Sequence, residues 1–182
     1  MQIIFLLVLI GIITAQNSCD FNWSKIGVTV AGGNGQGNKN FQLNIPTAIY
    51  LNPKFELLYI SNSVGNSLIK WKPSAEHGTF LVKPNSEQLK FPNGLALDLY
   101  GNIYVMDSGN ARIQQFCQTS QDEGGRTIVG PTKEQLVSPF ALAIDLQLNL
   151  YVTDVKLNQV LQFKRLLTSD SNDICKYKPL IF

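Results

Sequence analysis

The feature that most constrains the fold of this chain is a repeat with an almost constant period. Pro46, Pro92 and Pro139 are separated by 46 and 47 residues. Two aromatic positions recur with spacings of 45 and 47 residues, Tyr59, Tyr104 and Tyr151 at one and Trp71, Phe116 and Phe163 at the other. Self-similarity of this length identifies an array of one supersecondary unit, in which neighbouring copies bury a shared core.

Each copy consists of strand-length runs between turn residues. In the middle copy these runs cover 95–97, 103–106 and 112–116, and clusters of Gly, Asn and Asp separate them. Such short runs predict strands joined by hairpins rather than helices. A fourth run, Thr79–Val82 or Thr127–Val129, follows each of the first two copies, and a similar one, Val28–Val30, precedes the first. Four strands per unit predict an all-β fold of β-propeller blades.

The sequence from Tyr104 to Phe116, YVMDSGNARIQQF, resembles the strand–turn–strand signature of the NHL-repeat family of β-propellers. The resemblance extends over about residues 28–165, with Asn62 in place of the turn Asp in the first copy and Leu157 in place of the turn Gly in the third. It implies four-stranded antiparallel blades, about three of them in this chain, and a closed ring that typically has six. The chain therefore corresponds to half of a six-bladed ring.

The first segment has the properties of a targeting signal. An apolar run extends from Ile3 to Ile13, which is too short for a membrane span of ~20 residues but matches a signal-peptide core. Ala15 and Gln16 then predict cleavage after residue 15. We therefore expect a signal peptide at 1–15, a lead-in at 16–27, blades at 28–165 and a C-terminal tail at 166–182, in a secreted protein without a membrane span. A buried N-terminal strand is the alternative.

The charge of the chain is low and dispersed. Charged residues make up 15% of the sequence, and the formal net charge of +2 is not concentrated in a basic block. Binding to nucleic acid requires clustered Lys and Arg that neutralise phosphates, so this composition argues against a nucleic-acid partner. The resemblance also implies a different alternative, an NHL-type regulator that binds RNA or acts in the ubiquitin pathway. That alternative requires the N-terminal segment not to be a signal.

Two kinds of covalent modification are predicted. Of the three cysteines, Cys117 ends the third strand of the second copy and Cys175 follows the third strand of the last. A tail that folds back would join these two and leave Cys19 unpaired, and buried free thiols are the alternative. The sequon at 22–24 makes Asn22 a candidate glycosylation site before the first blade.

Candidate catalytic groups are few. His77 is the only histidine, and one imidazole cannot build a three-ligand zinc site. Asp107 and Asp154, with Asn62 at the equivalent position, recur once per unit, and such side chains cap turns by accepting hydrogen bonds from the backbone amides that follow. The sequence therefore predicts no catalytic residue, no metal site and no cofactor. A calcium- or zinc-dependent propeller hydrolase or lyase is the competing function, because carboxylates of successive blades could converge on the axis.

A binding face follows from the topology of a propeller. Links between successive units share one face with the turns between second and third strands, and function concentrates in loops on a rigid scaffold. The predicted function is a non-catalytic module that binds an extracellular protein or glycan, or acts as a scaffold. The polar candidates on this face are Asn34, Asn66, Asn110, Arg112, Lys156 and Asn158.

Three units leave two blade faces without a neighbour. Apolar surface of this extent marks an interface, and three explanations remain open. A homodimer would complete a six-bladed ring, with Val28–Ala31 of one copy as the outer strand of the other copy's last blade. The chain could instead be a truncated product, or Ile174–Phe182 could complete its own last blade.

Overall fold

The computed structural model describes residues 22–52, 54–117, 124–131, 134–166 and 175. The predicted signal peptide at 1–15, Cys19 and most of the C-terminal tail lie outside these ranges. The described part contains eleven strands and one short 3-10 helix, η1 (Ser108–Asn110). The strands are β1 (Pro46–Asn52), β2 (Leu57–Asn62), β3 (Ser67–Trp71), β4 (Thr79–Val82), β5 (Pro92–Leu97), β6 (Ile103–Asp107), β7 (Arg112–Phe116), β8 (Arg126–Val129), β9 (Pro139–Ile144), β10 (Leu150–Asp154) and β11 (Gln159–Phe163).

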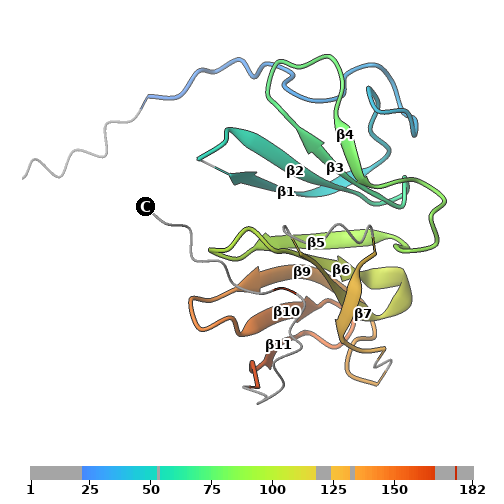
Figure 1. The fold of residues 1–182 in the computed structure, drawn as a ribbon, viewed down its shortest axis with the longest axis vertical. Coiled ribbons are helices and arrows are strands. Elements are labelled where there is room, and N and C mark those ends of the chain that lie inside the picture. The colour runs from blue at the N-terminus through green and yellow to red at the C-terminus, as the bar shows by residue number, and fades with distance from the viewer. Residues whose placement is uncertain (1–21, 53, 118–123, 132–133, 167–174, 176–182) are drawn as a thin grey trace, which may run out of the picture.

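The strands form three antiparallel sheets, which we call blades 1 to 3. Blade 1 has the order β1-β2-β3-β4 and blade 2 the order β5-β6-β7-β8, while blade 3 shows β9-β10-β11 in its described part. Because β5 packs between β1 and β9, the first strands of the three blades lie side by side and the sheets are arranged like a fan (Figure 1). The architecture confirms the predicted all-β fold of propeller blades.

Blades 1 and 2 pack against each other through an apolar core. The second strands β2 and β6 are buried along almost their whole length, because both faces of the sheet are covered. This double burial explains why these runs are apolar without a polar alternation. The buried members of the core are Tyr59, Leu68, Val82, Leu89, Leu95, Leu97, Ile103 and Val105.

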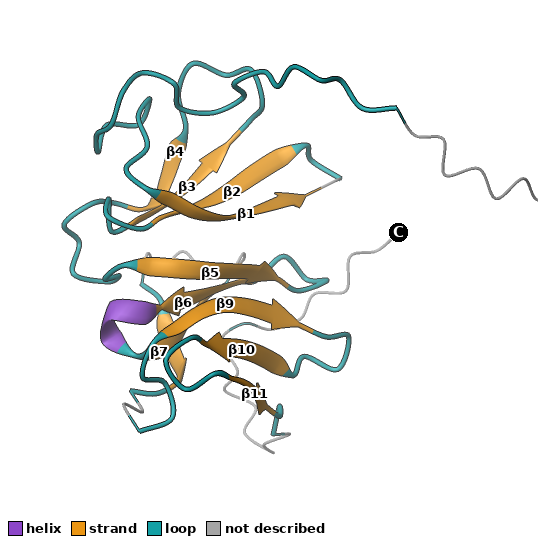
Figure 2. Cartoon of the chain, turned by 180° about the vertical axis from the view of Figure 1, so that it is seen from behind, coloured by secondary structure: helices purple, strands orange, loops and turns teal. Residues whose placement is uncertain are grey.

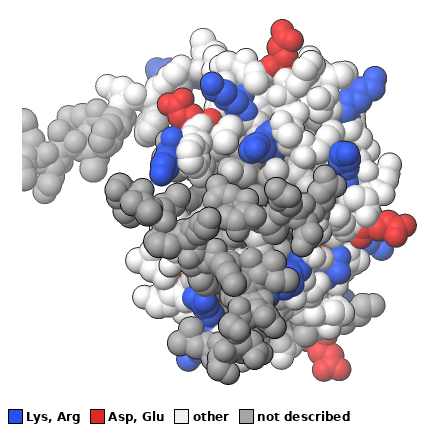
Figure 3. All heavy atoms as spheres, in the orientation of Figure 1, with Lys and Arg blue, Asp and Glu red and all other residues white. Residues whose placement is uncertain are grey.

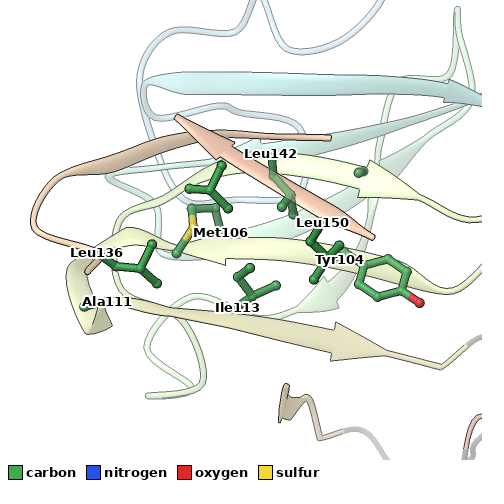
Figure 4. Close-up of a cluster of buried hydrophobic side chains, with 9 residues drawn as sticks. Tyr104, Met106, Ala111, Ile113, Leu136, Leu142 and Leu150 are labelled. Carbon is green, nitrogen blue, oxygen red and sulfur yellow. The ribbon is translucent and has the colours of Figure 1, made fainter. Parts of the chain in front are cut away.

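Blades 2 and 3 share a second core, in which side chains from β5, β6, β7, β9 and β10 meet (Figure 4). The two first strands come very close at Gly94, where an added Cβ atom would lie 2.7 Å from the backbone nitrogen of Leu142. Glycine is therefore the residue that this approach of β9 to β5 requires. The buried members of the core are Ala96, Tyr104, Met106, Ala111, Ile113, Leu136, Leu142, Leu150 and Val152.

The segment 22–45 runs along the face of blade 1 that is turned away from blade 2 (Figures 1 and 2). Ala31 and Leu43 pack there against four buried residues, Leu58, Ile60, Ile69 and Trp71. The strand predicted at Val28–Val30 is not formed, since these residues are exposed and carry no strand pairing. The prediction failed because an outer strand needs the third strand of a blade as its partner, and in blade 1 that position is already taken by β4.

A disulfide joins Cys117, directly after β7, to Cys175, and the two Cα atoms are 5.2 Å apart. This is the pair that the sequence favours. The bond therefore holds Cys175 beside the end of β7 in blade 2.

One face of the molecule can be judged for its distribution of charge. On the face seen in Figure 3, Lys and Arg side chains are scattered rather than gathered in one patch, as the composition predicts. Within the part of the chain that the structure describes, no helix is long and apolar enough to cross a membrane.

Candidate binding face

The turns between second and third strands lie against the segments that lead into the first strands. In blade 1 the backbone N–H of Ser63 donates to the carbonyl oxygen of Ile45 at 3.0 Å. In blade 2 Gly109 donates to Lys90 at 2.8 Å, and in blade 3 the N–H of Val155 donates to the carbonyl of Ser138 at 3.0 Å. Both kinds of segment therefore share one face, as predicted, and η1 marks it at the edge of the sheets in Figure 2. We call it the turn face.

In each blade, one buried polar side chain links the two kinds of segment on this face. The Oδ1 atom of Asn62 accepts a hydrogen bond from the backbone N–H of Asn44 at 2.6 Å. Asp107 accepts one from the N–H of Lys90 at 2.6 Å. In blade 3, Asp154 accepts from the backbone N–H groups at the equivalent position, those of Val137 at 2.7 Å and Ser138 at 2.9 Å. The recurring polar residue therefore joins the end of the second strand to the start of its own blade.

The predicted turn-capping role of these residues is correct only in part. Asp154 also accepts from the backbone N–H groups of Lys156 and Leu157 in the following turn, at 3.1 and 3.0 Å. Asp107 instead accepts from two side chains, the amide of Asn110 at 2.9 Å and the guanidinium of Arg112 at 2.7 Å. Burial alone would raise the pKa of the Asp154 carboxyl, but the four backbone donors outweigh it and lower the pKa below its ordinary value.

At the opposite end of the blades, Asp98 and Asp145 cap the first hairpin turns as expected. Asp98 accepts from the backbone N–H groups of Tyr100 and Asn102, both at 2.9 Å. Asp145 makes the equivalent bonds, and the side-chain amide of Asn149 is the main reason why its pKa is lowered. These carboxylates therefore stabilise turns.

Four of the six polar residues predicted for binding are held by the fold itself. The amide of Asn34 donates to the carbonyl of Phe41 at 3.0 Å, and Asn66 accepts from the backbone N–H of Phe91 at 2.8 Å. The amide of Asn110 donates to Asp107. Arg112 contacts the same carboxylate and donates to the carbonyl of Gln88 at 2.9 Å. Their polar groups therefore already form hydrogen bonds within the fold.

The other two candidates, Lys156 and Asn158, are exposed at the tip of the last turn. Asn158 has a φ of 52°, and the equivalent turn residues Asn66 and Ala111 have φ of 46° and 50°. Asparagine tolerates this left-handed conformation better than most residues, so its presence is explained by the turn. Among the described residues, Lys156 is the one candidate whose side chain neither forms a hydrogen bond within the fold nor meets a conformational need.

A set of apolar side chains on the same face is absent from the candidates that the sequence predicts. They lie in the turns after the second strands or beside the prolines that begin the first strands, where polar loop residues are usual. Each is large and exposed to solvent, and the set is Ile45, Val64, Phe91, Val137, Phe140, Val155 and Leu157. The signal that could have found them is the apolar residue directly before Pro46 and Pro92.

Two of these apolar residues adopt an unusual backbone conformation. Ile45 has a φ of 53° and Phe91 a φ of 46°, at equivalent positions of blades 1 and 2. A left-handed conformation is uncommon for a bulky residue and is an outlier for a β-branched one. Strain of this kind clusters at sites where the surroundings hold a side chain for a purpose.

The remaining sequence candidates lie away from the turn face. His77 is exposed, and its ring is 5.8 Å from that of Phe41. Asn22 is exposed near the start of the described chain, which leaves room for a glycan. Among the residues that the structure places, no three His, Cys, Asp or Glu side chains lie together in a way that could hold a metal ion.

The sequence of blade 2 matches a known repeat, because residues 89–116 fit the family model of the NHL repeat. No curated protein sequence matches the chain. Among solved structures, a chain of the nidogen/laminin complex has a TM-score of 0.55 at 24% identity, over 67% of this chain and 44% of that one. A gluconolactonase from Xanthomonas campestris has a TM-score of 0.51 at 20% identity, over 64% and 36%. A virginiamycin B lyase from Staphylococcus aureus reaches 0.48 at 14% identity, over 69% and 44%.

The chain spans less than half the length of each of these solved chains. The first two likenesses concern the fold alone, and they agree with the arrangement of blades seen in the structure. Together with the match over residues 89–116, they confirm the resemblance to NHL-repeat propellers.

Proposed function

We propose that this NHL-type propeller segment is a secreted, non-catalytic module whose turn face binds an extracellular protein. The observation that carries the proposal is the set of seven apolar side chains exposed on that face. Large apolar side chains gathered on one surface of a protein mark interaction sites. Phe91 and Phe140 are suited to be the anchors, because aromatic residues are enriched at the centres of protein interfaces.

The polar groups of the face favour a protein partner over a glycan, because most of them already form hydrogen bonds within the fold. Recognition of a sugar depends on hydrogen-bonding groups that are free to meet hydroxyls, and the amides of Asn34, Asn66 and Asn110 already serve the fold. Lys156 remains at the edge of the face, where polar contacts usually surround an apolar centre. One solved structure with this fold belongs to a complex between two proteins, the nidogen/laminin complex, which agrees with the proposal.

The absence of catalysis is proposed from the way the carboxylates are used. Asp154 accepts four backbone hydrogen bonds, and Asp107 is bound to Lys90, Asn110 and Arg112. A calcium ion at either residue would have to replace bonds that hold the blade together. Both side chains are buried, so they are not presented to a substrate.

Secretion is proposed from two independent observations. The apolar run at 3–13 has the length of a signal-peptide core. The Cys117–Cys175 disulfide needs an oxidising compartment to persist, as the secretory pathway provides.

The test is capture of extracellular proteins by the purified, secreted chain. Wild type and the double variant Phe91→Asn with Phe140→Ser are immobilised and exposed to conditioned medium and matrix extract. The control carries Leu99→Asn with Leu146→Asn, two apolar residues in the first hairpin turns at the opposite end of the blades, which are even more exposed than Phe91 and Phe140. Proteins captured by wild type and by the control, but lost from the turn-face variant, would support the proposal.

Identical capture by all three proteins would overturn it, and so would the loss of capture in the control alone. A glycan array probed with the same proteins is the second arm. Binding to sugars that the turn-face variant loses would assign the face to a carbohydrate instead of a protein.

A further inference from the structure

The chain contains two Asn-Gly pairs, Asn34-Gly35 and Asn93-Gly94. Asparagine is among the thermolabile residues of proteins. It is most labile before glycine, because no Cβ atom then shields the backbone nitrogen that can attack the asparagine side chain. The structure places the two pairs in opposite environments, so a comparison of them shows which pair can react in the folded protein.

The pair Asn93-Gly94 is held inside blade 2. Asn93 lies in β5, where its carboxamide oxygen accepts from the hydroxyl of Ser63 at 3.0 Å and its nitrogen donates to the hydroxyl of Ser108 at 3.1 Å. Gly94 is buried and lies close against the backbone of Leu142. The carboxamide of Asn93 therefore cannot turn towards the nitrogen of Gly94 while the blade is folded.

The pair Asn34-Gly35 lies on the surface. Both residues are exposed in the loop before β1, and nothing lies within 4 Å of the position that a Cβ atom of Gly35 would take. The backbone N–H of Gly35 enters no hydrogen bond among the described residues. The carboxamide nitrogen of Asn34 donates to the carbonyls of Phe41 and Gly32, at 3.0 and 3.5 Å, and exposed bonds of a loop open at little cost. The nitrogen of Gly35 is therefore able to reach the side chain that precedes it.

From this contrast we propose that Asn34 deamidates spontaneously in the folded protein and thereby loosens the loop that covers blade 1. The backbone nitrogen of Gly35 forms a bond to Cγ of Asn34 and gives up its proton. The bond from Cγ to Nδ2 breaks, and the carboxamide nitrogen leaves with that proton as ammonia. Water then opens the cyclic imide at one of its two carbonyl carbons. The products are aspartate and isoaspartate, and water is the only co-reactant.

The product cannot keep the contacts that Asn34 now makes. An ionised carboxylate only accepts hydrogen bonds, so it repels the carbonyl oxygen of Phe41 to which the amide donated. Isoaspartate also lengthens the backbone at residue 34, whose carbonyl oxygen accepts from the side-chain amide of Gln42 at 3.1 Å. Deamidation therefore weakens both links between Asn34 and the segment that leads into Leu43.

This loop matters because it covers one face of blade 1. Leu43 packs with Ala31 on the face that is turned away from blade 2 (Figure 2), over buried residues that include Trp71. Trp71 is only 1% exposed, so a loosened loop admits solvent to a side chain that is now dry. The inference does not rest on the proposed binding function, because none of the seven apolar residues of the turn face takes part in the reaction.

The first test is peptide mapping by mass spectrometry after incubation of the folded protein in warm, mildly alkaline buffer. We expect the mass change that replaces NH2 by OH, and labelling by an isoaspartate methyltransferase, in the peptide of Asn34 and not in that of Asn93. In denaturant both pairs are free to move, so both should convert. The proposal is overturned if Asn93 converts as fast as Asn34 in the folded protein, or if neither converts there while both convert in denaturant.

The second test follows the cover over blade 1. The chain has two tryptophans, so the variant Trp23→Phe leaves Trp71 as the single fluorophore of this kind. Quenching of its fluorescence by acrylamide should increase as Asn34 converts, and Asn34→Asp in the same background should show increased quenching from the start.

The matched control is Asn34→Gln in the Trp23→Phe background. Its side chain keeps the carboxamide but is too long to close the same ring, so its quenching should not change during incubation. Circular dichroism checks that each variant folds. If the fluorescence of Trp71 stays equally protected after Asn34 has converted and in Asn34→Asp, the proposed effect on the cover is wrong. A rise in the Asn34→Gln control equal to that of its parent would show that the loosening has another cause.

Discussion

The backbone N–H of Lys90 donates a hydrogen bond of 2.6 Å to Oδ1 of the buried Asp107, 17 residues later in the chain. The bond joins the segment before β5 to the end of β6, and Asn62 and Asp154 make the same connection in the other blades. A buried acceptor that satisfies a loop amide in every blade holds the turn face in one conformation. A surface fixed in this way loses little conformational entropy when a partner binds.

Replacing Asp107 should test how strongly this connection stabilises the fold. Asp107→Ala removes the acceptor for Lys90 and leaves the guanidinium of Arg112 without its carboxylate. Breaking such a pair costs ~3 kcal/mol, at the low end because Arg112 is partly exposed to water. Asp107→Asn keeps an oxygen that accepts from Lys90, as Asn62 does for Asn44 in blade 1. Its loss in the free energy of unfolding should therefore be smaller. Urea denaturation measures the free energy of unfolding of both variants. Equal losses would show that the hydrogen bond to Lys90 contributes little to stability.

The stability of the protein should fall in acid because of Asp154. Its folded pKa lies below the ordinary value, so the ionised carboxylate stabilises the fold. This contribution is complete above the unfolded pKa of about 4 and is lost as the pH falls through the folded value. Asp154→Asn should therefore lower the free energy of unfolding at neutral pH, and the difference from wild type should shrink below about pH 4. A difference that stays constant into acid would exclude this role.

The strands were predictable because their signal is local. The predicted runs Thr79–Val82 and 112–116 coincide with β4 and β7, since turn residues at each end mark their limits. Val28–Val30 has the same composition, yet it forms no strand. A strand also requires an edge to pair with, and that requirement cannot be derived from the segment itself.

The candidate site was predictable in position but not in chemistry. The repeat places Asn66 and Asn110 on the turn face, as the structure confirms, but their partners are Phe91 and Asp107 within the fold. The partner of Asn66 is 25 residues away, on the next blade, so no local pattern identifies it. The apolar residue directly before Pro92 signals the position of Phe91, but the exposure of its side chain depends on packing by residues distant in the sequence.

Gly94 should not tolerate a side chain. An added Cβ atom would lie 2.7 Å from the nitrogen of Leu142 and 2.8 Å from the carbonyl oxygen of Phe140, and both belong to backbone that cannot move aside cheaply. Gly94→Ala should therefore destabilise the fold by about 1–3 kcal/mol through overpacking. Gly124→Ala is the matched control, because nothing lies within 4 Å of its added Cβ atom. Thermal unfolding of both variants checks this, and equal midpoints would contradict the close approach of β9 to β5.

The disulfide should make a large contribution to stability. Cys117 and Cys175 are 58 residues apart, and a cross-link over a loop of that length stabilises a folded chain by about 4 kcal/mol, chiefly by restricting the unfolded state. We expect the double substitution of both residues by Ser to lower the free energy of unfolding by about this amount. A reducing agent should have the same effect on wild type and none on the double variant. Cys19→Ser, which leaves the bond intact, should unfold like wild type, and a loss in that variant would argue for a different pairing.

Relief of strain at Ile45 should stabilise the protein while weakening its turn face. Ile45 has a φ of 53°, a conformation that costs a residue other than glycine about 1–2 kcal/mol and that asparagine tolerates better. Because the side chain is exposed, Ile45→Asn loses little burial and should raise the free energy of unfolding by roughly 1 kcal/mol. Leu146→Asn, at an exposed residue with ordinary φ, should leave stability unchanged. If the Ile45 variant is also captured less well by the extracellular partner, the strained conformation is retained for binding at a cost in stability. A variant that is no more stable than wild type would show instead that the surrounding hydrogen bonds, not the side chain, set this conformation.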